Sequence, residues 1–392
     1  MLVKPSYVTT YCVGKPSTPA YVQTNICYLN FSGFALVCMS VVMVLMSYGG
    51  VLDVTGAVSA VWSGVFKYRT CSEKHDLVFL KVHKTGSSTM ANIIERFGFQ
   101  RKLNFALPNK TQGEVRYNYI GRIGETLNET RIQPSQKNAK LYNLLYNHVI
   151  YNWKSFNVIF PRRRTTYVTL LRHPLSQFKS SLLYFRNSAI YTAATENLTK
   201  YLENIRQHEP SNPYISFTDN RQSLDLGLPS HKVRDEGFIT RYIEMLDKAF
   251  DLMLIMDYFD ESLVMLRRKM CWSMKDILYI RSNKAYRHFD FVFGEYEKSL
   301  LKDWSLADNL LYDHFYTKFH FHLKKDPNIM EEAHWFKLAL DKTQTFCSGN
   351  STESKTRIEK SPWNPPFYVT SLDCAFMKLG ELEFLNMMLD GI

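Results

Sequence analysis

The chain has 392 residues, of which 45% are hydrophobic and 14% aromatic, so it can form one large core or two smaller ones and is not disordered. Its formal net charge of +11 is spread through the sequence and is not gathered in a tail. This charge suits an anionic ligand, an acidic surface or nucleic acid equally well, so it excludes none of them.

The first predicted element is an apolar segment near the N-terminus. No charged residue occurs between Lys15 and Asp53, and residues 28–48 include the most apolar part of that stretch. Because a spanning helix needs about 20 apolar residues, we predict an uncleaved signal anchor at 28–48 behind a cytoplasmic tail at 1–27. A cleaved signal peptide is the alternative, but the segment starts late and lacks a short basic region before a small-residue cleavage site.

Residues 49–75 are predicted to form a stem and residues 76–392 a luminal domain. Four N-glycosylation acceptors all follow the apolar segment, at Asn109, Asn128, Asn197 and Asn350. Four cysteines also follow it, at Cys71, Cys271, Cys347 and Cys374. An even set fits up to two disulfides in any of three pairings, with free buried thiols as the alternative. The predicted topology is a single-pass type II membrane protein.

Three strand-then-helix units predict an α/β domain with a parallel sheet. Nearly continuous apolar runs at 77–82, 167–171 and 252–256 are typical of strands covered on both faces, and a helical pattern follows each of them. The first of these helices has apolar residues on one face and Gly98 at the predicted stop position. The apolar residues are Met90, Ile93, Ile94 and Phe97.

Three further segments are predicted to lack regular structure. The polar, Asn-rich stretches at 104–140 and 186–232 are predicted to be long loops or insertions that face the acceptor. The proline-rich stretch at 360–367 is predicted to be irregular.

The sequence KVHKTGSST, residues 81–89, links the first predicted strand to its helix. A strand that ends in a glycine turn and opens a helix points backbone N–H groups and the positive end of the helix dipole at one spot, which favours an anion. Lys84 adds a full charge, and the hydroxyls that follow Gly86 can donate hydrogen bonds or cap the helix. Because the lysine precedes the glycine, this is not a Walker A loop, and a nucleotide triphosphate site is disfavoured. An ordinary capped helix with a solvated lysine is the alternative.

A second strand-to-helix turn, in residues 165–181, places Arg172 at the strand end and Ser180 two turns into the helix. An arginine in that position binds phosphate by charge-assisted hydrogen bonds, and ligands of open α/β sheets lie at the carboxyl ends of the strands. A local salt bridge is the alternative for a single arginine. Two such turns together predict a ligand with two separated anionic groups.

These motifs resemble sulfotransferases that use 3′-phosphoadenosine 5′-phosphosulfate (PAPS). KVHKTGSST with FALPNK, YNHVIYN, RHPLSQFKSSLLYF and DYFDESLVMLRR is similar to the galactose-3-O-sulfotransferase family, from about residue 76 to at least 320. The resemblance implies a P-loop-like sulfotransferase fold and a Golgi type II enzyme that sulfates the 3-hydroxyl of a terminal β-galactose on a glycolipid or glycoprotein. It also implies that Arg172 and Ser180 hold the 3′-phosphate. The residues implied to hold the 5′-phosphosulfate are Lys84, Thr85, Gly86, Ser87, Ser88 and Thr89.

Three side chains are predicted to carry the chemistry. Lys84 neutralises the departing phosphate oxygen, His83 is the general base, and His148 is a second catalytic or galactose-orienting group, with a packed structural histidine as its alternative. The family usually has acidic residues where this chain has His173 and Lys179, and it tends to have an arginine soon after the position of His148. The latter difference leaves another galactoside or another hexose as an alternative acceptor.

The remaining expectations concern cofactors and partners. His320 and His322, two apart in KFHFHLKK, are predicted to be structural or surface residues, and no metal is expected. Nucleic acid is not an expected partner, and the sequence leaves open whether the protein forms a homodimer. A catalytically inactive, membrane-anchored glycan-binding protein with the same fold is the main alternative, and a nucleotide kinase is a weaker one.

Overall fold

The computed structural model describes residues 71–109, 118–134, 141–188, 191–281, 290–349 and 354–389. These residues all belong to one compact unit, Val65–Ile392. The predicted tail, the predicted anchor and most of the predicted stem lie outside them. Within the described ranges, no helix combines the length and the apolar character needed to cross a membrane.

Four parallel strands form the main sheet of the described chain, in the order β2-β1-β3-β4. They are β1 (Leu77–Leu80), β2 (Leu144–Leu145), β3 (Thr166–Leu171) and β4 (Leu252–Ile255). Every residue of β1 and β3 is buried, which confirms the prediction of strands covered on both faces. The α/β class with a parallel sheet is therefore confirmed, whereas β2 was not predicted because two residues are too short to show a pattern.

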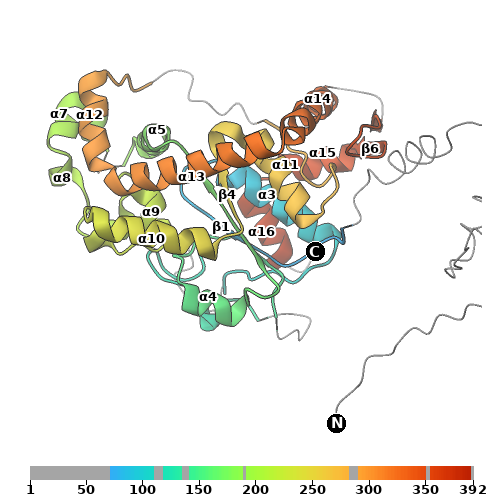
Figure 1. Cartoon of the computed structure of the whole chain (residues 1–392), viewed down its shortest axis with the longest axis horizontal. Helices are drawn as coiled ribbons and strands as arrows, with labels where there is room; N and C mark the ends of the chain where they lie inside the picture. Colours follow the sequence, from blue (N-terminus) through green and yellow to red (C-terminus); the bar gives the residue numbers. More distant parts are fainter. Residues whose placement is uncertain are drawn as a thin grey trace, which may run out of the picture. The chain divides into compact units, whose positions relative to one another are not determined.

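The described helices surround this sheet (Figure 1). They are α3 (Ser87–Gln100), α4 (Trp153–Ile159), α5 (Pro174–Phe185), α6 (Thr192–Glu196), α7 (Leu198–Glu203), α8 (Ile205–His208), α9 (Arg221–Asp225), α10 (Glu236–Ala249), α11 (Phe259–Met270), α12 (Glu295–Trp304), α13 (Leu306–Lys325), α14 (Asn328–Ser348), α15 (Ser371–Lys378) and α16 (Glu381–Leu389). Helices α15 and α16 pack against α3, α14 packs against α11, and α10 packs against α13. The carboxyl ends of β1 and β3 are thus held by a sheet that packed helices surround.

Helix α3 differs from its prediction at one residue. Its predicted apolar face is buried, but the helix continues through Gly98 to Gln100. A Cβ added at Gly98 would lie 2.3 Å from Leu144 Cδ1 and 2.3 Å from Phe105 Cζ. Gly98 is therefore required by the close approach of α3 to β2, and it does not end the helix.

The predicted long loop at 186–232 is wrong in part. The described residues of this stretch contain α6, α7, α8 and α9, none longer than six residues. Such short helices show no clear periodicity in the sequence, and tertiary contacts hold them: Asp308 of α13 accepts hydrogen bonds from the backbone N–H groups of Gln222 and Ser223 in α9. Through Gln222, α9 also reaches the turn that follows β3.

A two-stranded antiparallel hairpin lies near the C-terminus, formed by β5 (Lys355–Ile358) and β6 (Phe367–Thr370). Neither strand was predicted. The proline-rich stretch at 360–367 forms most of the connection between them, and only its last residue is in a strand, so the expectation of irregular structure there is confirmed.

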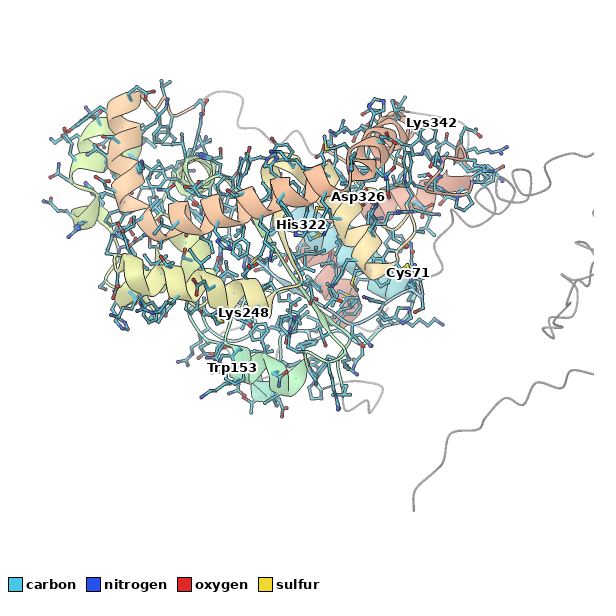
Figure 2. The ribbon with its side chains drawn as sticks, in the orientation of Figure 1. Cys71, Trp153, Lys248, His322, Asp326 and Lys342 are labelled. Carbon is cyan, nitrogen blue, oxygen red and sulfur yellow. A yellow bond between two sulfur atoms is a disulfide. The ribbon has the colours of Figure 1, made fainter. Side chains whose placement is uncertain are left out.

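Two disulfides join the four cysteines that follow the apolar segment. Cys71, labelled in Figure 2, is bonded to Cys271 at the end of α11, and Cys347 of α14 is bonded to Cys374 of α15. The structure thus selects one of the three pairings that the sequence allows, and it excludes free thiols at these positions. Disulfides are characteristic of secreted and luminal proteins.

We expect the Cys71–Cys271 bond to contribute more stability than the Cys347–Cys374 bond. The two bonds span 200 and 27 residues, and the loop-entropy model gives about 5 kcal/mol for the longer loop and about 3.5 kcal/mol for the shorter one. Urea unfolding of the Cys71→Ser/Cys271→Ser and Cys347→Ser/Cys374→Ser double variants measures both losses. A larger loss for the second pair would contradict the expectation.

The predicted glycosylation acceptors differ in accessibility. Asn128 and Asn197 are exposed, and each accepts a hydrogen bond from a backbone N–H at the start of a helical turn. Asn109 is buried and donates a hydrogen bond to the Thr130 carbonyl, so its side-chain amide is less accessible than those of the other two. Asn350 lies outside the described residues.

Candidate active site

Two turns at the carboxyl edge of the sheet form the centre of the site. The first turn, residues 81–86, joins β1 to α3, and the second, residues 172–173, joins β3 to α5. Because β1 and β3 are parallel neighbours, both turns leave the same edge of the sheet. The Arg172 guanidinium donates a hydrogen bond from Nη1 to the Lys84 carbonyl at 3.1 Å. The structure therefore brings these two cationic residues together.

Lys84 and Arg172 are half-buried, and within the described ranges neither forms an ion pair with a carboxylate. Burial, followed by the charge of Arg172, lowers the pKa of Lys84 to about 8. Burial also lowers the pKa of Arg172, and the charge of Asp257 opposes this shift. Two neighbouring cations that lose hydration without forming a direct ion pair favour the binding of an anion.

The Lys84 ammonium lies 3.5 Å from the centroid of the Tyr184 ring in α5. The ring faces the cation and stabilises it in the absence of an anion. Since Tyr184 is exposed, this contact is worth only about 0.5–1 kcal/mol and an anionic ligand can replace it.

The first turn depends on the backbone freedom of Gly86. Gly86 has φ +82°, and Lys84 has φ +62°, a left-handed conformation that is uncommon for a lysine. A Cβ added at Gly86 would lie 2.5 Å from the Met256 sulfur, just after β4. The left-handed conformation therefore favours glycine, and a Cβ at this position would also force the flexible Met256 side chain to move.

We expect Gly86→Ala to cost about 1–2 kcal/mol in the free energy of unfolding because of the left-handed backbone, and to weaken anion binding by displacing the turn. Gly237→Ala, within α10, is a matched control. Its added Cβ meets no atom nearer than 3.5 Å, and alanine is favoured over glycine in a helix by up to about 1 kcal/mol. Denaturant unfolding compares the two variants. Equal stability changes would contradict this account of Gly86.

The hydroxyls after Lys84 fall into two groups. Thr85 and Ser87 are buried, and both donate their hydroxyl hydrogens to the Val82 carbonyl, at 3.1 Å and 2.8 Å. They hold the turn in shape and do not direct these hydrogens outward. Ser88 is exposed and Thr89 is half-buried, so these two hydroxyls are accessible to a ligand.

Ser180 is half-buried on α5, where the sequence predicts a second phosphate contact. No hydrogen bond joins it to Arg172 among the described residues. The backbone of Arg172 is instead held by Gln222 of α9, whose amide oxygen accepts from the Arg172 N–H and whose amide nitrogen donates to the Arg172 carbonyl, both at 2.9 Å.

His83 is 6% exposed and lies among polar partners. Its Nδ1 is 2.7 Å from Asp225 Oδ2, and its Nε2 is 2.5 Å from the Tyr119 hydroxyl. Burial, followed by the charge of Arg221, lowers the pKa of His83 to about 4 despite the opposing effect of Asp225. His83 is therefore neutral above about pH 4, as a general base must be before it accepts a proton.

His148 follows β2 and stacks on His83, with ring centroids 3.8 Å apart. Its Nδ1 donates a hydrogen bond to the Lys81 carbonyl at 3.1 Å. Burial, followed by the charge of His83, holds the pKa of His148 well below its usual value. The structure thus places both predicted histidines next to each other and beside the first turn.

Four residues at the site were not identified from the sequence: Arg221, Gln222 and Asp225 of α9, and Tyr119. The spacing of Arg221 and Asp225 by four residues was the available signal, since it permits an ion pair within a helix, and their side chains are 2.5 Å apart. Nothing in the sequence links that pair to His83, which precedes Asp225 by 142 residues.

The histidine pair on α13 lies elsewhere. His320 packs against the rings of Tyr258 and Tyr316, at centroid distances of 4.8 Å and 4.3 Å. Among the described residues, no group of three or more His, Cys, Asp or Glu side chains is placed to hold a metal ion.

The sequence is similar to a known protein family and to several of its members. A family model described as Galactose-3-O-sulfotransferase matches residues 20–370. A galactosylceramide sulfotransferase of Mus musculus is 31% identical over 254 residues, which are 64% of this chain and 58% of that protein. The Homo sapiens galactosylceramide sulfotransferase is 28% identical over 307 residues, covering 75% of this chain and 70% of that protein. Galactose-3-O-sulfotransferase 2 of Mus musculus is 28% identical over 255 residues, covering 62% and 61% respectively.

Proposed function

Because the chain belongs to the galactose-3-O-sulfotransferase family, we propose that it transfers a sulfuryl group from PAPS to the 3-hydroxyl of a terminal galactose. Membership makes the chain a carbohydrate sulfotransferase, and therefore an enzyme. The acceptor is a galactose-terminated glycolipid or glycoprotein. The observation that carries the proposal is the contact between Arg172 and the Lys84 carbonyl, because it joins two cationic turns into one anion-binding edge.

The residues of this edge fit a nucleotide with two anionic groups. Lys84, with the turn closed by Gly86 and the accessible hydroxyls of Ser88 and Thr89, would hold the 5′-phosphosulfate. Arg172 would hold the 3′-phosphate, with Ser180 on the following helix. The supporting observation is that neither cation forms a direct ion pair with a carboxylate within the described ranges.

The proposed reaction is an in-line displacement at sulfur. The galactose O3 forms a new bond to sulfur, the bond between sulfur and the bridging phosphate oxygen breaks, and the O3 proton passes to His83 Nε2. The electron pair of the broken bond stays on the departing phosphate, whose added charge Lys84 neutralises. The pKa of His83, lowered to about 4, keeps this base unprotonated at neutral and mildly acidic pH.

His148 is proposed to orient the galactose. It is held in place by its stack on His83 and by its bond to the Lys81 carbonyl. Because its pKa is also well below the usual value, it stays neutral beside the base.

The proposed location is the Golgi membrane, with a type II topology and a luminal catalytic domain. The apolar segment at 28–48 supports membrane anchoring, and the two disulfides support an oxidising compartment.

Sulfate transfer from radiolabelled PAPS by the full-length protein tests the proposed function. The acceptors are a galactosylceramide, a galactose-terminated glycoprotein, a matched glucoside, and a 3-deoxygalactoside that lacks the reacting hydroxyl. We expect label on at least one galactoside and none on the 3-deoxy compound. Equal labelling of the galactoside and its 3-deoxy analogue, or no transfer to any acceptor, would overturn the proposal.

A further inference from the structure

We propose that Asp225 is a positioning residue that fixes the tautomer of His83, with its hydrogen on Nδ1, and that Arg221 holds Asp225 in place. This inference deepens the proposed function and rests on it, because it concerns the residue assigned as the base. It adds helix α9 to a site that the sequence motifs place at the two strand-to-helix turns and the helices that follow them.

The contacts of Asp225 with His83 define the arrangement. Asp225 Oδ2 accepts a hydrogen bond from the His83 backbone N–H at 2.9 Å and lies 2.7 Å from the ring Nδ1. Asp225 is only 2% exposed, so water does not compete for these bonds. One carboxylate oxygen thus fixes both the main chain and the ring of the same residue.

The charge of Asp225 determines which ring nitrogen carries the hydrogen. Burial alone would raise the pKa of Asp225, but Arg221 and then His83 overcome this effect and lower it to about 2. An ionised carboxylate only accepts hydrogen bonds, so Nδ1 must donate. Arg221 Nε also lies 3.2 Å from Nδ1, but a nitrogen that donates to Asp225 cannot accept from Arg221, and the shorter contact with the carboxylate decides the tautomer.

With the hydrogen on Nδ1, the Nε2 lone pair is available as the base. The Tyr119 hydroxyl, 2.5 Å from Nε2, then donates to it. A hydroxyl hydrogen-bonded to Nε2 is the arrangement that a sugar 3-hydroxyl needs when it transfers its proton to this nitrogen. The opposite tautomer would place a hydrogen on Nε2 and block the transfer.

Packing and hydrogen bonds of helix α9 hold Arg221 and Asp225 in place. Arg221, 1% exposed, donates to Asp225 Oδ1 at 2.5 Å and to the backbone carbonyls of Tyr214 and Ser216. The Asp308 carboxylate in turn accepts from the Ser223 hydroxyl at 2.7 Å. The position of Asp225 is therefore determined by the packing of α9, and not by His83 alone.

The groups that face the His83 ring act on its protonation in opposite directions. They are Asp225 and Arg221 from α9, Lys81 from the first turn, His148 after β2, and Tyr119. The charges of Arg221 and Lys81 lower the pKa of His83, whereas Asp225 raises it. Removing Asp225 and removing Arg221 should therefore move the acidic limb of a pH–rate profile in opposite directions.

The test compares Asp225→Asn, Asp225→Glu and Arg221→Met in the full-length enzyme, with kcat and kcat/KM measured from about pH 3 to about pH 8, so that a limb near pH 4 lies inside the range. The carboxamide of Asp225→Asn can donate to Nδ1, which favours the tautomer with its hydrogen on Nε2. This variant should therefore lower kcat by about 10²–10⁴-fold. It should leave the binding of adenosine 3′,5′-bisphosphate unchanged. Asp225→Glu should recover part of the rate. The acidic limb should move to higher pH in Arg221→Met and to lower pH in Asp225→Asn. Asp276→Asn, which loses a buried ion pair with Arg101 outside the site, is the control and should leave the limb unmoved.

Nitrogen-15 NMR of labelled histidine gives a readout that does not depend on activity, with the His83 signal identified by its absence in His83→Gln. The wild-type protein should show the hydrogen on Nδ1, and Asp225→Asn should show it on Nε2. An active wild-type enzyme whose rate, acidic limb and His83 tautomer are unchanged in Asp225→Asn would overturn this inference and leave the proposed function intact. A wild-type protein that sulfates no acceptor would instead overturn the proposed function, while the NMR result would still decide the tautomer.

Discussion

Replacing Lys84 with methionine is expected to lower kcat by about 10²–10³-fold, the usual effect of removing one group that stabilises developing charge in a water-poor site. Lys84 is half-buried, lies beside Arg172, and forms no ion pair within the described part of the chain. Its charge is therefore available to the phosphate oxygen on which electrons accumulate as the bond to sulfur breaks. Methionine retains most of the side-chain volume and removes the charge, and single-turnover sulfate transfer from labelled PAPS measures the effect.

Lys232→Met is the matched control for this experiment. Lys232 also lies over an aromatic ring, 5.5 Å from the centroid of Phe238, but it pairs with Asp235, and no hydrogen bond or ion pair joins it to either turn among the described residues. Its replacement should leave kcat unchanged. A Lys84→Met enzyme with wild-type kcat would remove Lys84 from the chemical step.

Replacing His83 with alanine is expected to lower kcat by about 10²–10⁴-fold, the contribution of a positioned general base. The residual rate should also lose the acidic limb, since the group whose pKa is about 4 is absent. Steady-state sulfate transfer between about pH 3 and about pH 8 measures both changes, because the limb lies near pH 4. Imidazole added to the assay should restore part of the rate, because the variant leaves space beside Asp225 and Tyr119 for a free base.

His334→Ala is the control for His83, because His334 is exposed on α14. It should retain the wild-type rate and pH profile. If His83→Ala kept the acidic limb, another group would be the base, and His148, stacked on the same ring, would be the first to test.

The parts of the fold that follow from local sequence pattern were predictable. β1, β3 and β4 each contain a nearly continuous apolar run, which is typical of a strand that is covered on both faces. The position of the two turns at one edge follows from parallel pairing alone. The adjacency of Lys84 and Arg172 could therefore be anticipated without knowing a single side-chain contact.

The parts that depend on contacts between distant segments were not predictable. Gly98 resembled a helix stop, but it is glycine because Leu144 and Phe105 approach the helix there. Thr85 and Ser87 are predicted from the sequence to hold the 5′-phosphosulfate, and the sequence could not show that their hydroxyls donate to the Val82 carbonyl. A hydroxyl that contacts a ligand and a hydroxyl that holds its own turn look the same in the sequence. Only the hydrogen-bond partner distinguishes the two roles.

Helix α9 is the most consequential element that the sequence did not predict. Its five residues are too few to show a helical period, and the hydrogen bonds from α9 to Asp308 that hold it involve residues about 85 positions away. Yet it supplies Gln222, which holds the Arg172 backbone, and Asp225, which holds His83. The motif sequences thus identify the residues that we propose contact the substrates, whereas Gln222 and Asp225, which hold two of them, come from a segment without a recognisable motif.

The central claim is that the two turns bind the two ends of a single bisphosphorylated nucleotide. Calorimetric titration of wild type and Arg172→Ala with adenosine 3′,5′-bisphosphate and with adenosine 5′-monophosphate tests it most directly. The wild-type protein should prefer the bisphosphate, and Arg172→Ala should lose about 1.5–3 kcal/mol of bisphosphate binding, the value of a charged hydrogen bond, with little change for the monophosphate. Equal weakening of both nucleotides, or no weakening of either, would contradict the claim.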